Sequence, residues 1–155
     1  MTEPQVSASQ GQAPGTLVDP RGPRFGAILT TIVLALVLLT APSTVATVLL
    51  VFQALVFALG AFLGLRAAPY GWLYRTLVRP RLGPPSELEE QAPPRFAQAV
   101  GFGFAAVALA AALLGWTAVS IAAVAMALVA AFLNAAFGYC LGCEMYLLIR
   151  RATAR

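Results

Sequence analysis

Four long apolar runs, almost free of charged side chains, are the feature that most restricts how this chain can fold. They cover residues 25–41, residues 45–65, residues 96–114, and a stretch from Thr117 toward Ile149. A helix of about 20 apolar residues crosses the roughly 30 Å hydrocarbon layer of a bilayer. The first run is short for this and has to borrow residues from its flanks. We therefore predict an all-α fold, a bundle of four transmembrane helices.

The composition excludes the common soluble classes. Of the 155 residues, 60% are hydrophobic and 10% are charged, whereas soluble domains carry roughly 25% charged residues. Too few polar side chains remain to cover a water-exposed globule. The chain also contains no histidine, so Ser-His-Asp or Cys-His catalysis cannot be assembled from one copy.

We predict two regions. Residues 1–23 are rich in Gly, Pro, Ser and Gln and have no apolar periodicity, which is typical of a flexible tail. Residues 24–151 form the four-helix membrane domain. The first run is interpreted as an uncleaved membrane helix because apolar sequence resumes directly after Pro42. Short turns follow at Pro42 and Ser43, and again at Gly115 and Trp116.

The connection between the second and third runs is long and different in character. Three aromatic residues, Tyr70, Trp72 and Tyr74, alternate there with arginines. Aromatic rings and arginines suit the headgroup level of a bilayer. We expect a short interfacial helix at residues 71–78 and a water-exposed loop at residues 80–94.

Charge predicts the orientation. All ten cationic residues are arginine, and all precede the first run, lie between the second and third, or follow the fourth. The two opposite turns carry no charge. By the positive-inside rule, both termini are then cytoplasmic. This placement at membrane ends also argues against nucleic-acid binding.

The two cysteines, Cys140 and Cys143, form a C-x-x-C motif followed by Glu144. On a helix these three residues share one face, and roughly 5–6 Å between the cysteine Cα atoms is within disulfide range. We predict a redox pair, with Glu144 as its proton carrier. The alternative is simple packing, since cysteine behaves as a small apolar residue.

The predicted position of the pair is chemically unfavourable. If the fourth helix continues to Ile149, the cysteines lie in its C-terminal half, at the cytoplasmic edge of the membrane. There the helix dipole and Glu144 both disfavour a thiolate, unless Gly138 breaks the helix. Two cysteines and one carboxylate are too few ligands for zinc or copper. We therefore assign no metal site and no cofactor to the single chain.

Other polar residues within the runs have a structural interpretation. We expect Gln53, Gln98 and Asn134 to form hydrogen bonds between helices. The third and fourth runs are dense in small residues, which let helices approach closely inside a membrane.

Four segments resemble a known family. They are the sequences at residues 19–25, 79–82, 93–98 and 138–143, which read DPRGPRF, RPRL, PPRFAQ and GYCLGC. The chain resembles, over residues 18–151, the domain-of-unknown-function 4395 family of small bacterial membrane proteins. It is more loosely similar to DoxX and MauE-like membrane proteins, some of which are linked with sulfur oxidation and disulfide handling. The resemblance implies a four-helix protein of the bacterial inner membrane.

These observations lead to one functional hypothesis with open alternatives. The leading hypothesis is a thiol–disulfide or sulfur-relay protein whose cysteines cycle between dithiol and disulfide or carry a persulfide. Its expected partners are a thioredoxin-like or sulfurtransferase protein and a membrane quinone, besides the lipid bilayer and a second copy in a homo-oligomer. The alternatives are a membrane scaffold or accessory subunit and a metal-handling protein. Whether the protein is an enzyme stays open at this point.

Overall fold

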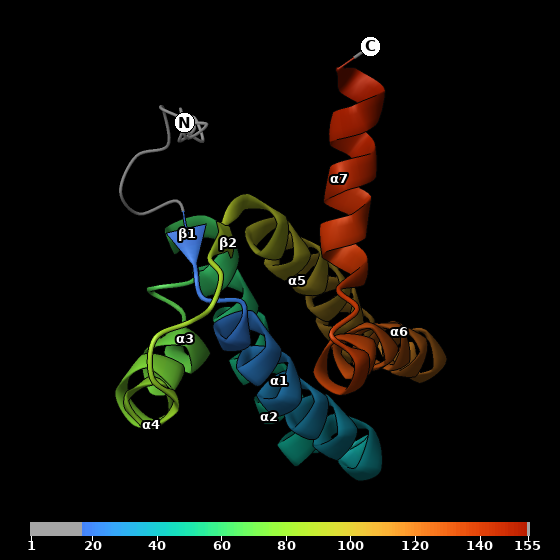
Figure 1. Cartoon of the computed structure of the whole chain (residues 1–155). Coiled ribbons are helices and arrows are strands. Elements are labelled where there is room, and N and C mark those ends of the chain that lie inside the picture. Colours follow the sequence, from blue (N-terminus) through green and yellow to red (C-terminus); the bar gives the residue numbers. More distant parts are fainter. Residues whose placement is uncertain (1–16, 155) are drawn as a thin grey trace, which may run out of the picture.

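The computed structural model describes residues 17–154, and its framework is four long helices (Figure 1). Each is long and apolar enough to cross a bilayer, which confirms the all-α four-helix prediction and makes this a multi-pass membrane protein. The helices are α1 (Arg21–Thr40), α2 (Thr44–Ala58) with its π-helical continuation η1 (Leu59–Leu63), α5 (Ala92–Leu113) and α6 (Thr117–Phe137).

The four helices close into a ring. α1 packs against α2 and α6, and α5 packs against the same two helices from the other side. Large side chains such as Leu34, Leu50 and Phe57 fill the α1–α2 half of the core, whereas alanines such as Ala108 and Ala127 fill the α5–α6 half. These small residues let α5 and α6 approach closely, as the sequence predicts. Much of the outer surface is apolar, as lipid contact requires.

One polar side chain is fully enclosed in the bundle. Gln53 on α2 is 0% exposed. It donates a hydrogen bond to the Thr30 hydroxyl of α1 and accepts one from the Tyr70 hydroxyl. The predicted interhelical role is thus confirmed for Gln53. Within residues 17–154, Gln98 and Asn134 form no side-chain hydrogen bond and instead line cavities.

The connection from α2 to α5 is helical over a longer stretch than expected. Three short elements follow one another: α3 (Pro69–Leu73), η2 (Tyr74–Val78) and α4 (Arg79–Leu82). They include the predicted residues 71–78 and extend beyond them at both ends. The loop predicted for residues 80–94 is shorter, because α5 already begins at Ala92.

The start of the described chain is held in place by a small sheet. Strand β1 (Leu17–Val18) pairs antiparallel with β2 (Glu89–Glu90) in the loop before α5. Most of the tail predicted for residues 1–23 lies outside the described residues. Its last part, from residue 17, forms β1 and the first turn of α1 instead.

The expectation of a fourth helix running from Thr117 toward Ile149 is wrong. α6 ends at Phe137, and a separate helix, α7 (Leu141–Thr153), begins after a sharp turn. Figure 1 shows α7 projecting past the end of the bundle where the described chain begins. The turn is made at Gly138, whose φ of 69° lies in the left-handed region that favours glycine.

Candidate functional site

The end of α6 is capped by contacts on both sides of Gly138. The Gly138 N–H donates to the Asn134 carbonyl and the Tyr139 N–H to the Leu133 carbonyl, which closes the helix in a glycine-terminated pattern. From the start of α1, the Arg24 guanidinium donates to the carbonyls of Ala135 and Ala136 at 3.2 and 3.3 Å. A cation at the last carbonyls is favourable because helix C-termini carry partial negative charge.

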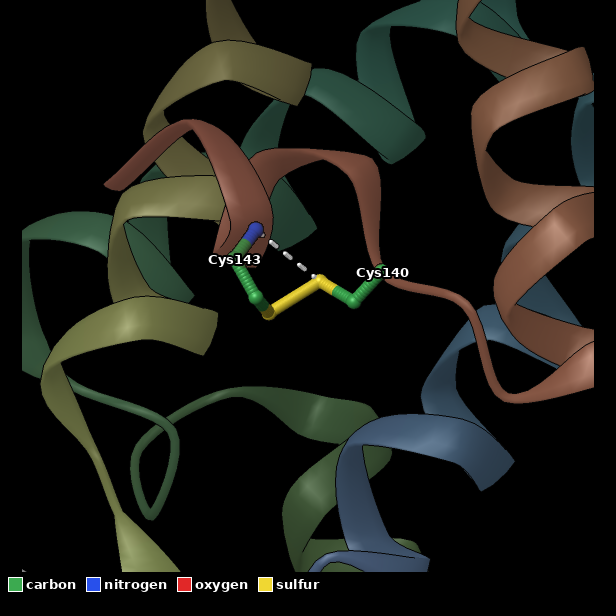
Figure 2. Close-up of a disulfide and its surroundings, with 2 residues drawn as sticks. All are labelled: Cys140 and Cys143. Carbon is green, nitrogen blue, oxygen red and sulfur yellow. Dashed lines mark hydrogen bonds between the residues drawn. A yellow bond between two sulfur atoms is a disulfide. The ribbon is translucent and has the colours of Figure 1, made fainter. Parts of the chain in front are cut away.

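The two cysteines form a disulfide directly after this turn (Figure 2). Their Cα atoms are 5.2 Å apart, which confirms that the predicted spacing is compatible with a bond. Cys140 is the N-cap of α7, and its Sγ accepts a hydrogen bond from the Cys143 N–H at 3.3 Å. Predicting the pair in the C-terminal half of a helix was wrong, since it lies at a helix N-terminus.

At this position the helix dipole favours a cysteine thiolate, whereas at the predicted position it would disfavour one. The N-terminus of a helix presents free N–H groups and partial positive charge. When the disulfide opens, both stabilise a thiolate at Cys140, as in redox proteins that place C-x-x-C at a helix start. Glu144, in the first turn of α7, is a neighbouring carboxylate that still opposes that negative charge.

Gly142, between the cysteines, is where α7 contacts α5. A Cβ atom added to Gly142 would lie 2.6 Å from the Cα of Ala97, so a side chain larger than hydrogen does not fit. The rings of Phe96 and Tyr146 pack with centroids 5.7 Å apart. The disulfide is therefore held against the N-terminal part of α5.

A cavity of about 690 Å³ with several charged residues in its lining, here called the polar cavity, lies beside the disulfide. Both cysteines line it, together with Glu144 and residues from α1, β2 and the start of α5. Within residues 17–154, Glu144 forms no ion pair. Instead, Arg150 of α7 lies 3.6 Å from the Glu90 carboxylate. The charged residues lining the cavity are Arg21, Arg24, Glu89, Glu90 and Glu144.

An apolar cavity of about 270 Å³ lies between α1, α5 and α6, and residues at the start of α7 also line it. Cys140 lines this cavity as well as the polar one, whereas Cys143 lines the polar one. Asn134 also borders both. Cys140 thus lines two cavities, one with charged residues in its lining and one without.

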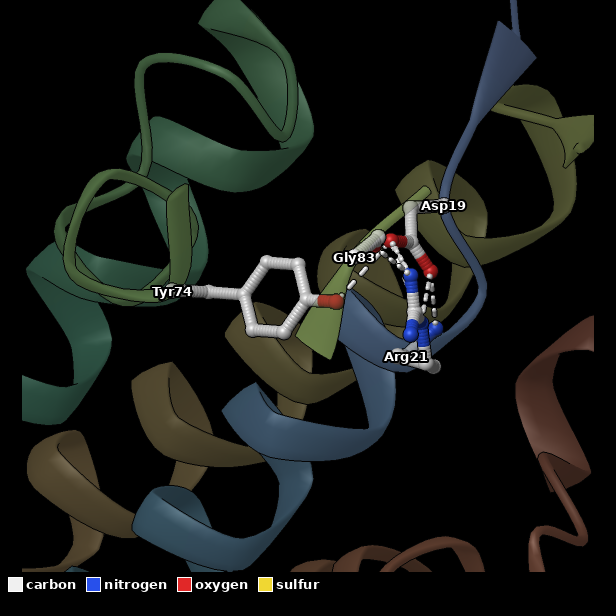
Figure 3. Close-up of polar contacts among 4 residues, drawn as sticks. All are labelled: Asp19, Arg21, Tyr74 and Gly83. Carbon is white, nitrogen blue, oxygen red and sulfur yellow. Dashed lines mark hydrogen bonds and ion pairs between the residues drawn. The ribbon is translucent and has the colours of Figure 1, made fainter. Parts of the chain in front are cut away.

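A second polar cluster lies at the start of α1 and shares Arg21 with the lining of the polar cavity (Figure 3). The Asp19 carboxylate accepts hydrogen bonds from the Arg21 side chain and the Tyr74 hydroxyl, and Arg21 also donates to the Gly83 carbonyl. Burial alone would raise the pKa of Asp19, but the hydrogen bonds from Arg21 and Tyr74 outweigh it and lower that pKa. Burial of Tyr74 itself and its hydrogen bond to Asp19 raise the pKa of Tyr74.

Four membrane helices with a half-buried C-x-x-C disulfide at one end of the bundle define the class: a multi-pass membrane protein with a cysteine pair at the bundle end. A family model matches residues 18–151. The chain accordingly belongs to the family described as domain of unknown function DUF4395. No curated protein and no solved structure matches the chain.

The structure brings together all three predicted site residues and adds others. Cys140, Cys143 and Glu144 line one cavity, as their spacing predicts. Sequence reasoning missed the capping role of Arg24 and assigned Glu90 to a solvated loop. Neither has a local signal, because both act on segments far away in the chain. Within residues 17–154, no cluster of three metal-ligating side chains is present.

Proposed function

We propose that this protein is a membrane-bound thiol–disulfide exchange protein that acts through Cys140 and Cys143. The observation that carries the proposal is the C-x-x-C disulfide at the N-terminus of α7, lining a polar cavity of about 690 Å³. A structural disulfide needs neither an open cavity nor a helix start that stabilises one of its thiolates.

The two sulfurs have different roles in this proposal. A thiolate of the partner, in the polar cavity, attacks the Sγ of Cys143, and the bond between Cys143 and Cys140 breaks. Cys140 leaves as a thiolate stabilised by the helix N-terminus, and a more stable thiolate leaves faster. A second thiol of the partner then attacks the mixed disulfide. The partner departs oxidised, and the pair is left as a dithiol.

Glu144 serves as the proton carrier of this exchange. It lines the same cavity as both sulfurs and forms no ion pair within the described residues, so its carboxylate is available. It takes the proton of the incoming partner thiol and returns it to the cysteine thiolate at the end of the cycle.

A protein with a dithiol of its own, such as a thioredoxin-like protein, suits the cavity as partner. A sulfurtransferase would use the same cavity if the pair carries a persulfide. We place the cavity on the cytoplasmic side of the inner membrane, because arginines gather at this end of the bundle and short uncharged turns lie at the other.

Trapping experiments in native membranes test the proposal. In Cys140→Ser, Cys143 can attack a partner disulfide and form a mixed disulfide. This chain then has no second thiol to resolve that bond, so the mixed disulfide should accumulate. Cys143→Ser should trap much less, because in this proposal Cys143 is the sulfur that bonds to the partner and Cys140 is the leaving group. Alkylation followed by mass spectrometry reports the redox state of the pair, and an added sulfur atom identifies a persulfide.

The opposite results are equally clear. If both cysteines stay reduced under every thiol oxidant and the double serine variant retains function, the exchange proposal is wrong. Loss of function in Ala123→Leu, at a buried helix contact, together with a silent double serine variant, would favour a scaffold instead.

A further inference from the structure

The apolar cavity next to Cys140 shares three lining residues with an open groove on the lipid-facing surface of the bundle, and together the two outline a passage. We propose that this passage between α5 and α6 admits a lipid-soluble quinone, which accepts two electrons from the reduced cysteine pair. This inference rests on the proposed thiol–disulfide exchange and names its electron acceptor and the site where that acceptor binds.

The passage consists of two contiguous hollows. An open groove of about 490 Å³ lies on the outside of α5 and α6. It shares Val100, Phe104 and Met126 with the inner cavity that ends at Cys140. Met126 is 59% exposed, so its flexible side chain stands where the groove meets the cavity. Movement of this side chain would give a molecule dissolved in the bilayer an apolar path from the outer surface to the sulfur.

The lining of the inner cavity matches a quinone better than a water-soluble carrier. None of the described residues that line it is charged. Its walls are alanines, Phe57, Phe104 and methionines, with the amides of Gln98 and Asn134 among them. Neither amide forms a hydrogen bond within residues 17–154, so both N–H₂ groups are available for the carbonyl oxygens of a quinone ring. Ligand sites commonly combine an apolar lining with a few such polar groups.

The position of Cys140 lets a quinone in the passage react with the cysteine pair. It is the cysteine that lines both cavities, and it is the thiolate that the helix N-terminus stabilises. The Cys140 thiolate adds to a ring carbon of the quinone, which forms a C–S bond. The Cys143 thiolate then attacks the Cys140 Sγ, the S–S bond forms, and the C–S bond breaks.

The electron pair of the broken C–S bond stays on the ring. The two protons released by the cysteine thiols end on the two ring oxygens. The net reaction converts one dithiol and one quinone into one disulfide and one hydroquinone, so atoms and electrons balance. Partner thiols react on the polar side and quinone on the apolar side, and the two substrates never need to meet.

A single-turnover experiment with the full chain in lipid nanodiscs tests this inference. The protein is reduced, freed of excess reductant and mixed with decylubiquinone without oxygen. We expect one hydroquinone per cysteine pair, with the cysteines returning to the disulfide. Ala130→Phe places a ring in the inner cavity and should slow the reaction about tenfold or more, a cost of about 1.4 kcal/mol.

The neighbouring Val129→Phe is the matched control. Val129 is 56% exposed and lines neither hollow, so this variant should react as the wild type does. Binding has a separate readout in Cys140→Ser, which cannot turn over. A photoreactive quinone should still label α5 or α6 in this variant, and Ala130→Phe should abolish the labelling.

Thiol exchange is measured in the same nanodiscs as the rate at which dithiothreitol reduces the disulfide. Ala130 does not line the polar cavity, so this rate should be unchanged in Ala130→Phe. If exchange proceeds in the wild type but no hydroquinone forms, or if both phenylalanine variants react alike, the quinone inference is overturned and the exchange proposal stands. If the wild-type disulfide is inert to thiols as well, both fall.

Discussion

Gly142→Ala is the substitution with the sharpest expected effect on the site. The added Cβ would lie 2.6 Å from both the Cα and the Cβ of Ala97, whereas carbon atoms in contact are about 3.5–4.0 Å apart. The start of α7 must therefore move away from α5 by about 1 Å. Neither atom of Ala97 can rotate aside, because one belongs to the helix backbone and the other is fixed to it.

The magnitude follows from two opposing terms. Forcing a methyl group into a well-packed contact costs about 1–3 kcal/mol. Replacing glycine by alanine inside a helix returns up to about 1 kcal/mol, and less in a first turn such as this one. We expect a net loss of about 1–2 kcal/mol in the stability of the α5–α7 contact. Because Gly142 lies between the two cysteines, the disulfide shifts with it.

Thermal unfolding in detergent and the rate of disulfide reduction measure the two consequences. The matched control is Gly103→Ala, since a Cβ at Gly103 on α5 would meet nothing within 4 Å. The control should unfold at or above the wild-type temperature, whereas Gly142→Ala should unfold below it and react with thiols at a changed rate. If Gly142→Ala is as stable as the control, α7 does not dock on α5 through this residue.

Three further predictions concern the contacts around the site, each measured by the apparent Tm in detergent. Asp19→Asn should cost about 2 kcal/mol at pH 7. The fold lowers the pKa of Asp19 below its ordinary 3.8, so the carboxylate stabilises the fold above that pH, and this contribution disappears as the pH falls through the lowered pKa. The difference in Tm between Asp19→Asn and the wild type should therefore close in acid. A difference that stays constant with pH would contradict this. Tyr74→Phe should cost about 1 kcal/mol, because it loses the hydrogen bond to Asp19. An unchanged Tm would mean that this hydrogen bond does not stabilise the fold. Arg24→Ala should cost about 1 kcal/mol at the end of α6, whereas Arg151→Ala, at an exposed position without such a contact, should have no effect.

The bundle could be predicted from the sequence because a bilayer imposes a length and a composition on each helix. The runs at residues 45–65 and 96–114 needed no tertiary information, since lipid rather than a partner surrounds much of each helix. The proximity of Cys140, Cys143 and Glu144 was equally local. Any helical turn over these residues brings them onto one face.

The break between α6 and α7 could not be predicted, because distant residues decide it. Glycine is common inside membrane helices, so Gly138 alone does not distinguish a continued helix from an ended one. The deciding contacts come from elsewhere: Arg24, 111 residues away from Ala135 in the chain, occupies the last carbonyls of α6, and Ala97 accepts the close approach of Gly142. Their effect on the chemistry is large, because the same C-x-x-C motif within a continuous helix would face the negative end of a dipole. Ending α6 at Gly138 places Cys140 at a positive end instead, which is where the proposed exchange needs its leaving group.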